Sequence, residues 1–163
     1  MGSRVGRLWW PLLATGLTWG AFLVLAPLLK APTLAPELAE RLAGGVRLAL
    51  FPVAVVLAQM ASVQFRQLGA GAPSGRSYRV ARRALADTMV YTVAFLPMLL
   101  ALSTELPPAW LGCLVLLVIL FVTGRLLFWI GSLNDARLAA SGTAVTLNVV
   151  LGMLAYLLLQ VTS

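Results

Sequence analysis

The chain has 163 residues, of which 61% are hydrophobic and 10% are charged. A soluble globular domain carries about a quarter charged residues, so this composition excludes the soluble class. The sequence contains no histidine and one cysteine, which excludes a histidine general base and a transition-metal site, and its formal net charge is +7.

Long apolar blocks follow one another along the chain, at residues 8–29, 45–65, 84–102, 108–133 and 140–161. Each has about the 17–25 residues that a helix needs to cross the hydrocarbon core of a bilayer. Lipid offers no partner to a backbone amide and the sequence lacks short alternating strands, so the blocks are predicted to be helices. The expected fold is a single all-α integral membrane domain, a five-span helical bundle.

The first block follows Arg4 and Arg7 and contains the motif GLTWG, in which Gly16 and Gly20 have the GxxxG spacing. This spacing lets two helices approach closely, so it indicates packing within the bundle or, as the alternative, contact with a second copy. A cleaved signal peptide is the other interpretation of the block. Its apolar stretch is longer than a typical signal core and no small-residue cleavage site follows promptly, so a retained helix is favoured.

Two uncharged polar residues lie at membrane depth, Gln59 in the second block and Asn148 in the fifth. A polar side chain in a membrane helix usually bonds to a neighbouring helix. Both side chains are therefore expected to form hydrogen bonds across helix pairs.

The connection at residues 66–83 is predicted to be a basic loop, with five arginines and no acidic residue. By the positive-inside rule, this loop and the N-terminus are expected in the cytoplasm and the C-terminus on the opposite side. The arginines are expected to contact anionic membrane lipids. No nucleic-acid partner is expected, because no nucleic-acid-binding motif accompanies the charge.

Two ionisable residues lie inside the third and fourth blocks, Asp87 and Arg125. The simplest interpretations are a helical pair of Asp87 with Arg83 and an arginine that extends to the membrane surface. Ionisable groups inside spans, however, usually face a partner or a wet cavity. We predict either a direct contact between Asp87 and Arg125 or a shared pocket rimmed by Arg79 and Arg83, open to the cytoplasm and suited to an anionic ligand.

Helical spacing assigns neighbours to these two charges. Phe128, Trp129 and Ser132 fall on the same face of their helix as Arg125, and Tyr91 falls on the same face as Asp87. The sequence therefore predicts that aromatic rings and a hydroxyl group accompany the charges.

Two segments, RALADTMV at the start of the third block and GRLLFWIGSLNDAR at the end of the fourth, carry a family resemblance. They resemble the MAPEG family (membrane-associated proteins in eicosanoid and glutathione metabolism), closest to its mattrin-like branch. The likeness covers residues 45–159. It implies a four-helix bundle plus one extra N-terminal helix, and a homotrimer with residues 45–65 at its axis. It also implies glutathione bound near the cytoplasmic face between subunits.

The match to the family pattern is partial in the third block. Arg83 and Ala84 match, Asp87 stands where the family has asparagine, and Val90 replaces a glutamate. The loss of this glutamate removes a natural partner for the amino group of glutathione.

The fourth block keeps the family's arginine as Arg125, while Ser132 takes the place of a tyrosine. If the protein is catalytic, the resemblance implies that Arg125 stabilises the thiolate of glutathione and that Ser132 donates a hydrogen bond. Past the helix end, Arg137 matches a basic residue, and Arg66 is the candidate match for the arginine that ends the family's first helix. The predicted ligand-binding residues are Arg66, Arg79, Arg83, Asp87, Arg125 and Arg137.

Two functions remain open from the sequence. One is a glutathione-dependent transferase or peroxidase that acts on a lipophilic substrate. The other is a non-catalytic mattrin-like scaffold or lipid-binding protein. A small transporter is less favoured, because no internal repeat is visible.

Overall fold

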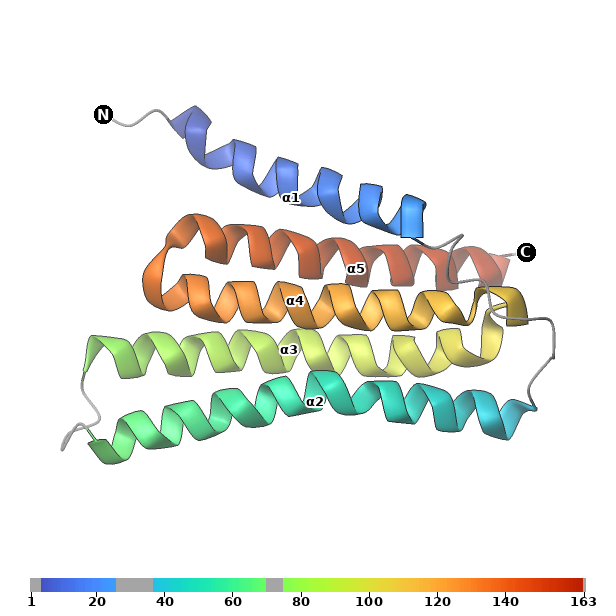
Figure 1. Ribbon diagram of the computed structural model, residues 1–163, viewed down its shortest axis with the longest axis horizontal. Helices are drawn as coiled ribbons and strands as arrows, with labels where there is room; N and C mark the ends of the chain where they lie inside the picture. Colours follow the sequence, from blue (N-terminus) through green and yellow to red (C-terminus); the bar gives the residue numbers. More distant parts are fainter. Residues whose placement is uncertain (1–3, 26–36, 70–74, 163) are drawn as a thin grey trace.

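The computed structural model describes residues 4–25, 37–69 and 75–162, and the described part is built of helices joined by short connections (Figure 1). In chain order the elements are α1 (Arg4–Leu25), α2 (Leu38–Gly69), α3 (Arg76–Glu105), the 3-10 turn η2 (Pro108–Trp110), α4 (Gly112–Asn134) and α5 (Ala136–Thr162). The predicted all-α bundle is confirmed.

Four of these helices are long and apolar enough to cross a membrane. They cover Leu38–Gln67, Ser77–Glu105, Pro108–Asn134 and Ala136–Thr162. The described apolar part of α1, Leu13–Leu25, is shorter, so a fifth span stays a prediction. The protein is therefore a multi-pass helical membrane protein by the length and composition of its helices.

The prediction of a loop at residues 66–83 is wrong for most of that stretch. Arg66 lies in the last turn of α2, and α3 begins at Arg76. Arginine and alanine are good helix formers, so these helices continue beyond their apolar blocks. The loss of apolar residues marks where the hydrocarbon ends and not where the helix ends.

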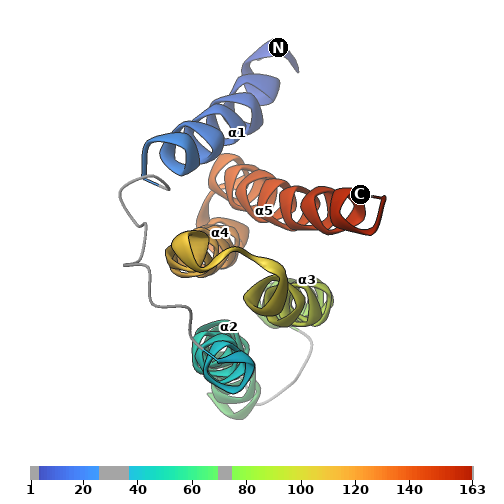
Figure 2. The same ribbon diagram turned by 90° about the vertical axis from the view of Figure 1, so that its right-hand side faces the viewer.

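Neighbouring helices from α2 to α5 run antiparallel, and α1 lies outside them against α5 (Figures 1 and 2). One end of the bundle, here called the basic end, holds the start of α1, the end of α2, the start of α3 and the α4–α5 turn (Figure 1). The opposite end, called the C-terminal end, holds the α3–α4 turn and the C-terminus. The arrangement brings Arg66 at the end of α2 and the arginines of α3 to the end where α4 meets α5.

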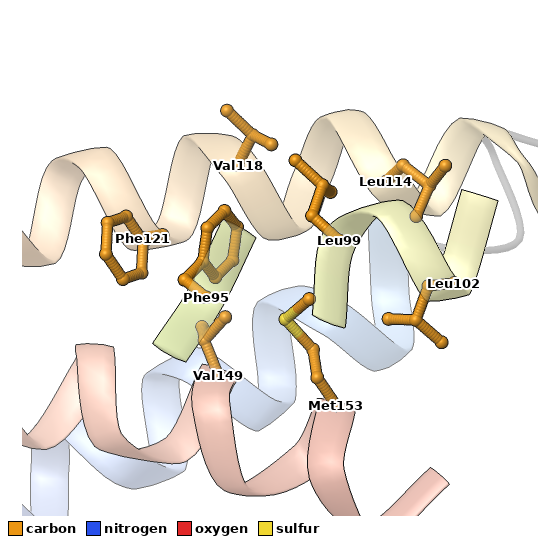
Figure 3. Packing of buried hydrophobic residues seen from close by; sticks show 8 residues of the cluster. All are labelled: Phe95, Leu99, Leu102, Leu114, Val118, Phe121, Val149 and Met153. Atoms are coloured by element: carbon orange, nitrogen blue, oxygen red, sulfur yellow. The ribbon is translucent and has the colours of Figure 1, made fainter. Parts of the chain in front are cut away.

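The apolar core lies between α3, α4 and α5 (Figure 3). The rings of Phe95 on α3 and Phe121 on α4 are stacked with their centroids 4.1 Å apart. Lipid is as apolar as a leucine side chain, so tight packing rather than removal from water holds such helices together. The buried core side chains are Phe95, Leu99, Leu102, Leu114, Val118, Phe121, Val149 and Met153.

Glycines bring α4 and α5 into backbone contact. A Cβ atom on Gly142 of α5 would lie 2.5 Å from the carbonyl oxygen of Gly124 on α4 and would also collide with the backbone of Phe128. A Cβ atom on Gly131 would collide with the backbone of Ala139. The two helices therefore form a hairpin that only glycine at these positions allows.

A polar contact at the C-terminal end joins α2 to α3. The guanidinium of Arg41 donates hydrogen bonds to the carbonyl oxygens of Thr104 at 3.0 Å and Leu106 at 3.2 Å. These carbonyls end α3 and have no partner in the helix itself, so a cation suits them. Nearby, a Cβ atom on Gly45 would lie 2.9 Å from the Oγ atom of Ser103, which shows how closely the two helices approach.

The contact of α1 with α5 confirms one prediction and contradicts another. The side-chain amide of Asn148 donates a hydrogen bond to the Oγ1 atom of Thr15 at 2.9 Å, as expected for a polar residue at membrane depth. By contrast, Gly16 and Gly20 have nothing within 4 Å of an added Cβ atom, so the expected packing of this motif within the bundle is wrong. The face of α1 that packs on α5 is instead the one that carries Trp19, which lies against Gly152.

Candidate functional site

Arg125 is fully buried in the bundle, although it lies inside a membrane span. Its Nε atom donates a hydrogen bond to the Oγ1 atom of Thr146 on α5 at 3.1 Å. Thr146 in turn donates its hydroxyl proton to the carbonyl oxygen of Gly142 at 2.9 Å. The close approach depends on Gly124, where a Cβ atom would lie 2.6 Å from the Thr146 hydroxyl. The close contact of α4 and α5 at their glycines thus also brings the Thr146 hydroxyl within hydrogen-bonding distance of Arg125.

Two aromatic rings contact the guanidinium. The Cζ atom of Arg125 lies 4.7 Å from the ring centroid of Tyr91 on α3 and 4.5 Å from that of Phe128 on α4. A cation over an aromatic ring is stabilised by about 2 kcal/mol when water is excluded. The predicted placement of Phe128 beside Arg125 is confirmed, and Tyr91 joins it from the neighbouring helix.

The predicted contact between Asp87 and Arg125 is wrong. The Nη1 and Nη2 atoms of Arg125 are buried and have no hydrogen-bond partner, and the side chain of Asp87 is exposed. Extension of Arg125 to the surface is excluded as well, because none of its side chain is exposed. The sequence gives the depth of each charge, but Tyr91, on the same face of α3 as Asp87, is the side chain that reaches the guanidinium, and Thr146 holds Arg125 from α5.

A cavity of about 710 Å³ opens at the basic end, between the start of α3, the end of α4 and the start of α5. We call it the basic-end hollow. It brings together three of the predicted residues, Arg83, Asp87 and Ser132. Its lining consists of Val80, Arg83, Ala84, Asp87, Phe128, Gly131, Ser132, Leu133, Asn134, Asp135, Ala136 and Ala139.

The hollow carries charges of both signs. Arg83 faces it together with the carboxylates of Asp87 and Asp135, so the lining is not the basic one expected from the sequence. The Oγ atom of Ser132 donates its proton to the carbonyl oxygen of Phe128 at 2.7 Å and is left as an acceptor. Such a lining suits a polar group that bears both positive and negative charge.

The remaining predicted ligand-binding residues lie outside the hollow. Arg66 is half-buried at the end of α2, and Arg79 and Arg137 are exposed near the starts of α3 and α5. Arg125 does not line the hollow either. It lies behind Phe128, whose ring contacts the guanidinium and whose side chain lines the hollow. Arg125 is therefore buried in the interior, apart from the charged side chains that line the hollow or lie at the surface.

The side chains of Gln59 and Thr92 are also buried in the bundle without hydrogen-bond partners. Neither the Nε2 nor the Oε1 atom of Gln59 has a hydrogen-bond partner, so the expected cross-helix bond of Gln59 is wrong. The Oγ1 atom of Thr92 on α3 is also buried and unpartnered.

Sequence reasoning missed Thr92 and Thr146. Both threonines lie on faces that turn inward, Thr92 four positions after the buried Thr88 and Thr146 four positions after Gly142. A helical row of small and hydroxyl residues is the signal that would have found them.

A second cavity, of about 420 Å³, lies at the C-terminal end between α1, α4 and α5. Its walls are almost wholly apolar and include the rings of Trp19, Phe22, Trp110 and Tyr156. The amide of Asn148 at its edge is already bonded to Thr15. The cavity offers no charged group to a ligand.

Among residues 4–25, 37–69 and 75–162, no three His, Cys, Asp or Glu side chains come together as a metal site would need. No protein-family model, no curated protein and no solved structure matches the chain.

Proposed function

We propose that the protein is a MAPEG-like integral membrane protein whose basic-end hollow binds the polar head of a small amphipathic or zwitterionic ligand, with glutathione as the first candidate. The basic end would face the cytoplasm, since arginines gather there. The observation that carries the proposal is the joining of Arg83, Asp87 and Ser132 in one cavity by α3 and α4. These residues lie in the two segments that resemble the family.

The chemistry of the hollow suits glutathione. The carboxylates of glutathione match the guanidinium of Arg83, because a guanidinium binds a carboxylate through two parallel hydrogen bonds. Its ammonium group matches the carboxylate of Asp87, one turn along α3 from Arg83, in place of the family's glutamate at position 90. Asp135 offers a second acceptor from the α4–α5 turn.

The geometry favours binding without thiol activation. A glutathione enzyme needs a cation or a hydrogen-bond donor next to the thiol. The Ser132 proton is committed to the carbonyl of Phe128, and Arg125 lies behind the Phe128 side chain. Catalysis would require both Phe128 and Ser132 to change position. We therefore propose a non-catalytic binding protein and not a glutathione-dependent enzyme.

Glutathione should stabilise the detergent-solubilised protein. At a free concentration one hundred times the dissociation constant, the gain is about 2.7 kcal/mol, because only the folded state binds. Thermal unfolding with S-methylglutathione, which has no free thiol, measures binding apart from redox effects. Arg83→Gln and Asp87→Asn should each abolish most of the stabilisation.

Arg82→Gln is the matched control, because Arg82 is an exposed neighbour on α3 that does not line the hollow. It should keep the full effect. Equal stabilisation of the Arg83→Gln and Arg82→Gln proteins would contradict the proposed site. Stabilisation by phosphatidylglycerol micelles and none by the glutathione analogue would assign the hollow to a lipid headgroup.

We also propose a homotrimer with α2 around its axis. The support is the outward face of α2, where Leu50, Phe51, Leu57 and Phe65 are exposed apolar side chains. Native mass spectrometry in mild detergent should find three chains. Ala54→Trp on the exposed face of α2 should disrupt the trimer, and Ala155→Trp on an exposed position of α5 should not. A monomer in several mild detergents would contradict this assembly.

A further inference from the structure

The apolar cavity at the C-terminal end is bordered by aromatic rings, and we call it the aromatic cavity. Trp19 and Phe22 line it from α1, Trp110 from η2 and Tyr156 from α5. The remaining wall includes a leucine-rich face of α4 that carries Leu117. Helices α4 and α5 are two of the apolar spans, so the cavity lies at the depth of the lipid.

Among the described residues the aromatic cavity is not sealed. Helix α1 packs along α5 and contacts α4 far less. The side chains of Trp19 and Trp110 at its border are 43% and 38% exposed. A molecule dissolved in the membrane therefore has access past these two rings.

The rings on the α1 side are held in place by their own contacts. The centroids of Trp19 and Phe22 are 6.3 Å apart and the ring planes meet at 77°, which is an edge-to-face contact. The Trp19 ring also rests on α5, where a Cβ atom on Gly152 would lie 3.0 Å from its Cη2 atom. A wall that is already ordered costs less conformational entropy when a ligand binds.

The aromatic cavity excludes a charged occupant. No charged side chain lines it, and its polar side chains bond within the protein. Thr18 donates its hydroxyl proton to the carbonyl oxygen of Ala14 at 2.7 Å, and Asn148 donates to Thr15 at 2.9 Å. An ion in the cavity would lose its water and gain no partner, which is costly.

The volume of the aromatic cavity gives the size of the occupant. Water needs two to four polar partners, and these walls do not supply them. A dry apolar cavity of about 150 Å³ holds one benzene ring, so a volume of about 420 Å³ has room for about three rings.

The rings of the wall decide between two kinds of apolar occupant. Lipid tails are as apolar as leucine, so an acyl chain gains little when it leaves the bilayer for an apolar cavity. A flat aromatic molecule gains stacked and edge-to-face contacts with rings, which the lipid tails do not offer. Selective binding from the membrane therefore favours a planar ring system.

We propose that the aromatic cavity binds one flat, uncharged lipophilic molecule of about three fused aromatic rings, taken from the membrane and held between α1, α4 and α5. The rings of Trp19, Phe22, Trp110 and Tyr156 recognise it. The site lies at the opposite end of the bundle from the basic-end hollow, so it is independent of the proposed glutathione site.

Anthracene and perhydroanthracene are the two probes. They share one carbon skeleton, but perhydroanthracene is saturated and has no aromatic face. Anthracene, added at a fixed ratio to the detergent, should raise the midpoint of thermal unfolding of the full chain by about 4 °C at saturation. Perhydroanthracene should leave the midpoint unchanged. Energy transfer from tryptophan to anthracene should saturate at one molecule per chain.

Two variants remove the site in different ways. Trp19→Leu takes away a ring of the wall, and Leu117→Trp fills the space from α4. Each should abolish most of the anthracene shift. The matched controls are Trp129→Leu, at a half-buried tryptophan outside the cavity, and Ile119→Trp, at an exposed position of the same helix. Both controls should keep the shift.

Three results would overturn the proposal. One is an unchanged midpoint of the unaltered chain in anthracene. Another is an anthracene shift that persists in Leu117→Trp. The third is an equal shift by perhydroanthracene, which would mean that the cavity accepts any hydrocarbon, such as a lipid acyl chain.

Discussion

Replacement of Gly142 by leucine is expected to cause the largest loss of stability of any single change considered for this protein. A side chain at this position meets the backbone of Phe128 and the carbonyl oxygen of Gly124, neither of which can move without separating α4 from α5. Overpacking a tight core costs about 1–3 kcal/mol where side chains can give way, and a backbone collision costs more. The separation also withdraws Thr146 from Arg125. The free energy of unfolding should therefore fall by more than about 3 kcal/mol, measured by thermal or denaturant unfolding in detergent.

Gly16→Leu provides the matched control for this change. The substitution is the same, and Gly16 also lies in an apolar helix, but nothing lies within 4 Å of a Cβ atom there. The unfolding midpoint of this variant should stay close to that of the unaltered chain. If both variants lose equal stability, the close packing of α4 on α5 is not what holds the bundle together.

Arg125→Met is expected to raise the free energy of unfolding of the protein in detergent. The change removes a buried cation whose Nη1 and Nη2 atoms have no partners, and the relief of its desolvation, which amounts to several kcal/mol per ion, should outweigh the lost contacts with the rings of Tyr91 and Phe128. Thr146 keeps its hydrogen bond to Gly142, so the change leaves no new unpaired group. Unfolding midpoints of the variant and of the unaltered chain in the same detergent measure the gain.

A double-mutant cycle identifies the residue that holds Arg125. Thr146→Val leaves the Nε atom of Arg125 without its acceptor and should cost about 1–3 kcal/mol in the unaltered chain. It should cost far less in the Arg125→Met background, because no donor is then left unpaired. Glu105→Gln serves as the control, since Glu105 is exposed at the C-terminal end of α3, and its effect should be the same in both backgrounds. Coupling of Arg125 to Glu105 and none to Thr146 would contradict the observed contacts.

The sequence by itself determined the class of the fold. Long apolar blocks in a lipid environment can only be helices, because every backbone amide must be paired within its own segment. The length and order of these blocks follow from composition, and so does the gathering of arginines at one end. The helix boundaries did not follow, since α2 and α3 continue past their apolar stretches on the strength of helix-forming residues such as Arg66 and Arg83.

The sequence also indicated that Arg125 has a special position, and helical spacing correctly put Phe128 beside it. The partner of Arg125 was decided only by the tertiary structure. Periodicity gives the face of a residue on its own helix, but the rotation and separation of neighbouring helices depend on which backbones can touch. Glycines at 124, 131 and 142 let α5 approach α4 until Thr146 reaches the guanidinium. Asp87 thus lies at the surface, in the basic-end hollow, and Arg125 lies in the interior.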